Sequence, residues 1–104
     1  MSDLADFLLA RIAEDERVAR DADPSPWTAR KATSSTLVGS AMVLGIVAAT
    51  DAVHGEYLLR YQPSRVLAEC ESKRHLVGQL DDDLLRLLVP PYADHPDCRQ
   101  EWRP

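Results

Sequence analysis

The chain has little of several residue types on which enzymes and exported proteins depend. It contains only two cysteines, Cys70 and Cys98, which are too few for a disulfide framework. Its four glycines stand apart at positions 39, 45, 55 and 78, so none belongs to a glycine-rich phosphate-binding loop. The first residues form an acidic amphipathic segment instead of a basic region followed by an apolar run, and no export signal is expected. We therefore expect a reduced, cytoplasmic protein.

The sequence also lacks an excess of basic residues. Twelve lysines and arginines stand against 17 acidic residues, which gives a net charge of −5 and a pI near 5.0. A chain of this charge gains no long-range attraction to phosphate backbones, so nucleic acid is an unfavoured partner. Hydrophobic residues make up 45% and charged residues 28% of the 104 positions, as in ordinary folded domains. This length and composition predict one soluble globular domain.

One long stretch, residues 32–50, carries no charge at all. Its strongly apolar part, residues 37–49, has thirteen residues. A helix that crosses a bilayer needs about 20. The stretch therefore favours strands in a soluble body over a membrane span, and no membrane is expected as a partner.

Hydrophobic spacing and the positions of the prolines predict an α+β fold. Leu4, Phe7, Leu8 and Ile12 recur at helical spacing and predict a buried stripe on the first helix. Prolines interrupt the later helices because they cannot continue one. We expect a single domain over residues 1–104, with a small antiparallel sheet of two or three strands. The expected elements are a helix over about 3–21, strands within about 28–50, helices over about 52–61, 64–79 and 82–89, and an irregular tail over 90–104.

The apolar stretch suggests a surface for self-association. Gly39-Ser40 is typical of a tight hairpin turn, so Ala41–Thr50 is predicted as the longest strand. Alternation puts Met42, Leu44, Ile46 and Ala48 on one face of it and Val43, Gly45, Val47 and Ala49 on the other. Because both faces are apolar, we expect helices on one side and a second subunit on the other. The candidate self-association residues are Met42, Val43, Leu44, Ile46 and Val47.

Charged residues give a second set of candidates. The charges of the first helix are interpreted as a solvated face: Arg11, Glu14, Asp15, Glu16, Arg17 and Arg20. Arg65, Lys73 and Arg74, with Arg60 upstream, indicate a cationic patch for an acidic partner or phosphate, although Glu69 and Glu71 interleave with it. The run Asp81-Asp82-Asp83 is predicted to cap a helix and form its first turn.

Metal and catalytic signatures are weak. His54, Cys70, His75, His95 and Cys98 do not form the close ligand pairs of structural zinc sites, so we expect no metal, no cofactor and no catalytic residue. A hydrolase would require a pocket that joins Asp94, His95 and Cys98, and Asp94 and His95 remain candidate binding residues. Tyr92 and Trp102 are expected to dock the tail onto the core.

Several segments together resemble a family of small actinobacterial proteins of unknown function that also occur in phages. The segments are Asp15–Arg20, Pro24–Trp27, Pro63–Arg74, Leu85–Asp97 and the terminal Glu101–Pro104. The resemblance implies a shared fold with a pair of strands in the uncharged region, and a cytoplasmic bacterial setting. It implies no activity. Many members carry a longer insertion with Cys and His where this chain has only Leu76–Asp83, so the resemblance supports no metal site here.

These observations rank three hypotheses for function. The leading one is a non-enzymatic protein-interaction module that self-associates as a homo-oligomer through the apolar strand or through a helix. The first alternative is a nucleic-acid-linked regulator of phage or host. The second is a small hydrolase or metal-dependent enzyme.

Overall fold

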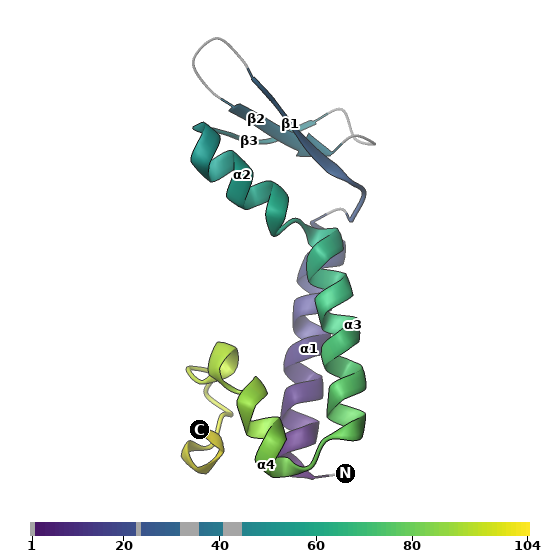
Figure 1. Ribbon diagram of the computed structural model, residues 1–104, viewed down its shortest axis with the longest axis vertical. Helices are drawn as coiled ribbons and strands as arrows, with labels where there is room; N and C mark the ends of the chain where they lie inside the picture. Colours follow the sequence, from purple (N-terminus) through teal and green to yellow (C-terminus); the bar gives the residue numbers. More distant parts are fainter. Residues whose placement is uncertain (1, 23, 32–35, 41–44) are drawn as a thin grey trace. The chain divides into compact units, whose positions relative to one another are not determined.

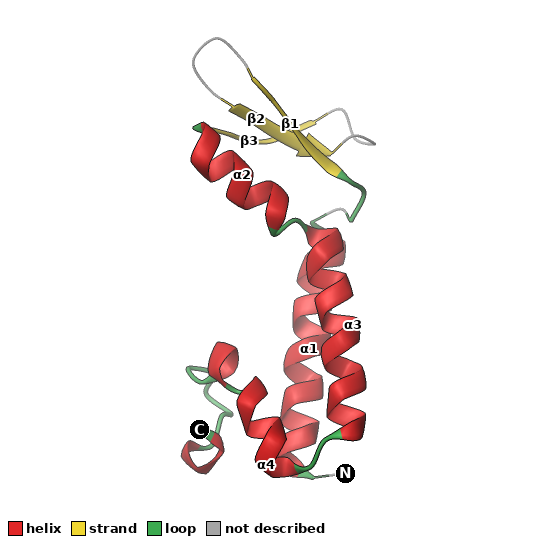
Figure 2. Cartoon of the chain, viewed as in Figure 1, coloured by secondary structure: helices red, strands yellow, loops and turns green. Residues whose placement is uncertain are grey.

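The structure, a computed structural model, describes residues 2–22, 24–31, 36–40 and 45–104. A long helix comes first, then three strands, then further helices (Figure 1, Figure 2), which confirms the expected α+β class. The helices are α1 (Asp3–Asp21), α2 (Ala52–Arg60), α3 (Pro63–Gln79) and α4 (Asp82–Leu85), and the strands are β1 (Trp27–Lys31), β2 (Thr36–Ser40) and β3 (Gly45–Thr50). Three 3₁₀ helices complete the chain: η1 (Arg86–Leu88), η2 (Pro90–Tyr92) and η3 (Gln100–Trp102).

The chain divides into two compact units. The helical unit comprises the residues up to Arg17 together with Glu69–Pro104, and the sheet unit comprises Val18–Ala68. The expectation of a single domain stays a prediction.

The apolar stripe of α1 forms the core of the helical unit. Leu8 and Ile12 are 0% exposed and Leu4 is 2% exposed, as the helical spacing predicts. Cys70 and Val77 of α3, and then Leu85 and Val89, contribute further buried side chains. Each fully buried leucine or isoleucine contributes about 1.5–3 kcal/mol relative to an exposed one, so this stripe is the main source of stability in the unit.

Short polar side chains fix where several helices begin. The Ser2 hydroxyl accepts a hydrogen bond from the backbone N–H of Ala5 (3.1 Å) at the start of α1. The Asp81 carboxylate accepts one from the N–H of Leu84 (3.1 Å), which confirms that the run of three aspartates caps α4. Such caps satisfy amides that have no partner within the helix.

The sheet unit holds a three-stranded antiparallel sheet in the order β1-β2-β3. The uncharged stretch, where it is described, therefore consists of strands. Helix α2 lies against one face of the sheet (Figure 1), and Val38 of the central strand is 0% exposed beneath it. Among the described residues, no helix is both long and apolar enough to cross a bilayer.

The predicted turn at Gly39-Ser40 is wrong. Both residues belong to β2, where Gly39 pairs with Thr28 and Ser40 pairs with Trp27. A glycine between apolar residues marks either a turn or a strand irregularity, and local sequence does not separate the two. Here it marks an irregularity, because the register between β2 and β3 shifts between Val38 and Gly39.

The strict alternation predicted for the third strand is also wrong. Ala48 pairs with Val38, whereas Ile46 pairs with the next residue of β2, Gly39. Val47 is therefore the extra residue of a β-bulge, and Ile46 and Ala48 do not occupy equivalent positions in the ladder. β3 begins at Gly45, and residues 41–44 of the predicted strand lie outside the described residues.

Gly55 permits the close approach of α2 to the sheet. A Cβ atom at this position would lie 2.9 Å from Cγ2 of Thr36, which is shorter than carbon atoms tolerate. Glycine within a helix normally costs stability relative to alanine. The packing against β2 explains why a helix this short contains one.

We predict that Gly55→Ala destabilises the protein by about 1–3 kcal/mol, because the new methyl group overpacks the interface between helix and sheet. Gly78→Ala is the matched control, since a Cβ there meets nothing within 4 Å. It should leave stability unchanged or raise it by up to about 1 kcal/mol. Urea unfolding followed by circular dichroism measures both. Combining Gly55→Ala with Thr36→Ser, which removes the opposing methyl, should restore part of the loss; equal stability of the two alanine variants would contradict the packing argument.

Candidate interaction surfaces

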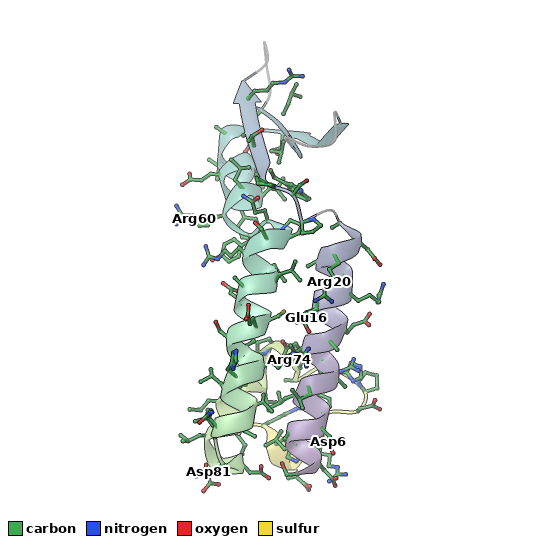
Figure 3. All side chains as sticks on the ribbon, turned by 90° about the vertical axis from the view of Figure 1, so that its right-hand side faces the viewer. Asp6, Glu16, Arg20, Arg60, Arg74 and Asp81 are labelled. Atoms are coloured by element: carbon green, nitrogen blue, oxygen red, sulfur yellow. The ribbon has the colours of Figure 1, made fainter. Side chains whose placement is uncertain are left out.

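The predicted cationic residues are divided between the two units. Arg65 belongs to the sheet unit, whereas Lys73 and Arg74 belong to the helical unit. Arg74 forms an ion pair with Glu16 of α1 (Figure 3), and the side chain of Glu16 is only 12% exposed. The Lys73 ammonium donates a hydrogen bond to the Tyr92 hydroxyl (3.3 Å) and lies 5.4 Å from the centre of its ring. Within the helical unit, these two cations join α3 to α1 and to the tail.

Tyr92 lies at the centre of this polar network. Its hydroxyl donates a hydrogen bond to Oδ2 of Asp15 on α1 (2.9 Å), although the two residues are 77 positions apart. Burial and the bond to Asp15 raise the pKa of Tyr92 well above its usual value. The expectation that Tyr92 docks the tail is therefore confirmed. The neutral phenol is the form that this environment stabilises.

The interpretation of the α1 charges as a solvated face is wrong in part. Arg11, Asp15 and Glu16 are half-buried, because the tail and α3 pack over them. Glu14 and Arg17 are exposed as expected, and they form an ion pair with 2.7 Å between Oε1 and Nη2. The sequence does not distinguish the half-buried charged residues of α1 from the exposed ones, because both kinds recur in the same pattern along the helix.

His95 lies against two hydrogen-bond donors and can accept a bond from one of them. Its Nε2 contacts the Arg11 guanidinium, and its Nδ1 lies 3.0 Å from the backbone N–H of Asp97. Its ring also meets the edge of Phe7, with 5.8 Å between ring centres. Since a guanidinium only donates, Nε2 must accept, and a neutral ring can accept from only one of these two donors. His95 therefore positions the tail on α1.

The residues proposed for a hydrolase pocket are not arranged as a nucleophile and base. The Cys98 thiol contacts the carbonyl oxygen of Arg99 (3.7 Å), while Asp94 is exposed. Burial, followed by the nearby charges of Asp15 and Glu16, raises the pKa of Cys70, which disfavours its reactive thiolate. In the described part of the chain, no three His, Cys, Asp or Glu side chains gather closely enough to hold a metal ion.

The predicted self-association residues are only partly described. Met42, Val43 and Leu44 lie outside the described residues. Ile46 and Val47 belong to β3, which forms one edge of the sheet. An edge strand has backbone groups available for pairing with another chain.

Helix α2 has an exposed apolar stripe that the sequence analysis did not single out. Val53 is 75% exposed, Tyr57 63% and Tyr61 46%, although all three are large and hydrophobic. They recur every four residues, so they share a face of the helix. The rings of Tyr57 and Tyr61 lie 4.9 Å apart, and the Arg65 guanidinium lies 4.6 Å from the centre of the Tyr61 ring. Val53, Tyr57, Tyr61 and Arg65 are called the α2 stripe below.

Charges of opposite sign stand at the two ends of α2. Asp51 caps its N-terminus, where the carboxylate accepts a hydrogen bond from the His54 N–H (2.8 Å) and contacts the His54 ring. These bonds hold the pKa of Asp51 below its usual value. Beyond the other end, Arg65 of α3 donates a hydrogen bond to the carbonyl oxygen of Arg60 (3.2 Å). In sequence, the acidic Asp51 precedes the α2 stripe and the basic Arg65 is its last residue.

Gln62 connects the end of α2 to the sheet. Its side-chain amide donates a hydrogen bond to the carbonyl oxygen of Leu59 (2.8 Å), and its side-chain oxygen accepts one from the Trp27 N–H (2.8 Å). The sequence gives no signal for this role of Gln62, because Trp27 lies 35 residues away from it in the chain. Gln62 thereby fixes the junction from which Arg65 reaches Tyr61.

A shallow pocket of about 440 Å³ lies on the other side of α2. Its charged residues, Glu56 and Arg60, form an ion pair with each other (3.4 Å). The remaining lining is largely apolar: Ala29, Thr36, Ala52 and Leu59.

Comparison with known proteins gives one match. The model described as "Family of unknown function (DUF6221)" matches residues 1–104. No curated protein and no solved structure matches the chain.

We predict that Tyr92→Phe lowers the free energy of unfolding by about 1–2 kcal/mol, because the half-buried Asp15 carboxylate loses its donor. Tyr57→Phe is the matched control, since it removes the same hydroxyl from a side chain that is 63% exposed. Chemical denaturation measures both variants. Equal losses would show that the hydroxyl of Tyr92 has no special role.

The raised pKa of Tyr92 also predicts a pH dependence. In the unfolded chain this phenol ionises near pH 10, at about the ordinary value for tyrosine. Because the folded pKa is higher, the contribution of Tyr92 is complete below about pH 10 and falls as the pH rises further. The stability difference between wild type and Tyr92→Phe should therefore stay constant up to about pH 10 and shrink as the pH rises above that value. A difference that does not shrink above about pH 10 would contradict the assignment.

Proposed function

This chain belongs to the DUF6221 family of unknown function, and we infer that it is a non-enzymatic protein-interaction module that self-associates through the α2 stripe. The observation that carries this proposal is the exposure of Val53, Tyr57 and Tyr61 on a single helix face. Contiguous exposed apolar side chains of this kind mark interaction sites more often than inert surface. Tyrosine and arginine are also enriched among the residues that dominate binding energy.

A second copy of α2 is the partner that the charges favour. Two copies related by a twofold axis pair antiparallel, so the same surface serves on both sides. With Tyr57 at the axis, Val53 of one copy faces Tyr61 of the other. The acidic end at Asp51 then meets the basic end at Arg65, and the attraction holds this register.

The small size of the α2 stripe limits the expected strength of self-association. A stable interface uses roughly 20–30 residues on each side, and the α2 stripe offers far fewer. We therefore propose a concentration-dependent dimer with a dissociation constant on the order of micromolar or weaker. The edge strand β3, which contains Ile46 and Val47, is the alternative surface for self-association.

Sedimentation velocity over a range of about 1 to 500 µM tests the dimer. We predict that Tyr57→Ser weakens association by about tenfold or more, because Tyr57 lies at the axis and loses its contact in both copies. Leu87→Ser is the matched control: Leu87 is 66% exposed but belongs to the helical unit, outside the α2 stripe. A wild type that stays monomeric at the highest concentration would overturn self-association. A dimer that survives Tyr57→Ser would overturn the helical interface.

A nucleic-acid-linked role is the second candidate, and the stacked side chains of Tyr57, Tyr61 and Arg65 favour it. Aromatic rings and guanidinium groups bind unpaired bases by stacking. The sheet unit has five basic and four acidic residues, so it lacks the overall negative charge of the whole chain. Binding of a labelled single-stranded oligonucleotide at low salt, weakened by Tyr57→Ser and by added salt, would support this role.

A further inference from the structure

A groove of about 330 Å³ lies in the helical unit, where the first turns of α1 meet the tail. It is separate from the α2 stripe, which belongs to the sheet unit. Its walls combine aromatic rings with charged side chains: Asp3, Asp6, Phe7, Ala10, Arg11, Asp97, Arg99 and Trp102. This volume is at the lower end for small-ligand sites, so it suits one long side chain better than a large ligand.

Aromatic rings form one wall of the groove. The ring centres of Phe7 and Trp102 lie 5.2 Å apart, and Phe7 is only 8% exposed. This contact confirms that Trp102 docks the tail onto the core. Because the faces of aromatic rings carry negative charge density, such a wall attracts cations.

Two arginines of the chain already use parts of this wall. The Arg11 guanidinium lies 5.9 Å from the centre of the Phe7 ring. The Arg99 guanidinium lies 4.8 Å from the centre of the Trp102 ring, and its Nη2 lies 3.1 Å from Oδ2 of Asp3. Stacking on a ring combined with a carboxylate contact is the typical environment of a bound guanidinium. The contacts of Arg99 therefore indicate that the groove accommodates a guanidinium group.

Two further carboxylates in the groove are not paired with a cation in the way that Asp3 is paired with Arg99. Asp6 (labelled in Figure 3) and Asp97 are exposed, and neither carboxylate has a hydrogen-bond or ion-pair partner among the described residues. The helical unit as a whole carries 13 acidic and seven basic residues. This excess draws cations toward the groove from solution.

We propose that the groove binds an arginine side chain of a basic peptide. The planar guanidinium donates hydrogen bonds to the carboxylates of Asp6 and Asp97, while its methylene groups lie against the part of the half-buried Trp102 ring that remains exposed. Arginine suits this arrangement better than lysine, because its fork of donors can serve two carboxylates at once. The site does not depend on self-association, so either proposal can fail without the other.

The test uses the fluorescence of Trp102 as its signal. The chain has two tryptophans, and Trp27→Phe removes the one in the sheet unit. In this background, an acetylated and amidated tri-arginine peptide at low salt should change the emission of Trp102 in a saturable manner. The tri-lysine peptide should bind several-fold more weakly. A tri-citrulline peptide, which keeps the shape but loses the charge, should not bind.

Paired variants separate a specific site from general attraction. Asp6→Asn with Asp97→Asn should weaken tri-arginine binding by about tenfold, since two charge-assisted contacts are lost. Glu71→Gln with Asp83→Asn is the matched control, because it removes the same charge from exposed positions of the helical unit outside the groove. It should change the dissociation constant by less than about twofold, and circular dichroism should show that both double variants fold. No saturable change at millimolar peptide, or equal weakening in the two double variants, would overturn the proposal.

Discussion

Burial of the apolar stripe of α1 is the interaction on which the helical unit depends. Leu4, Leu8 and Ile12 leave almost no surface to solvent, and the side chains that cover them come from α3 and from the segment after it. Once this stripe is covered, the charged residues beside it face neighbouring elements instead of water. The bonds of Asp15 to Tyr92 and of Glu16 to Arg74 follow from that geometry. Polar contacts of this kind specify where the tail lies more than they add stability.

The sheet unit depends on a different constraint, the close approach of α2 to β2. Gly55 leaves room for the Thr36 side chain and allows the helix to cover Val38. Because one face of α2 is used in this contact, the residues two positions before and after Gly55 point away from the sheet. Val53 and Tyr57 are exposed for this reason. The same helix therefore stabilises the sheet and provides the α2 stripe.

The two candidate surfaces use aromatic rings and charge in different ways. The α2 stripe is an exposed row of Val53, Tyr57 and Tyr61 with oppositely charged ends, which suits a partner of the same kind. The groove in the helical unit is a small concave site with aromatic and acidic walls, which suits a single cationic side chain. Both are proposed as recognition surfaces, and each would bind its partner through few residues.

The sequence by itself determined the features that depend on near neighbours. Helix starts at Ser2 and Asp81 follow from caps that act within three residues, and the α1 core follows from its 3.6-residue spacing. Only the tertiary structure decided the role of Gly39, the bulge at Val47 and the pairing of Tyr92 with Asp15. Each of these depends on which distant segment packs alongside, and side-chain type carries no record of a partner 77 residues away. The same holds for both candidate surfaces, because exposure is set by what the rest of the fold leaves uncovered.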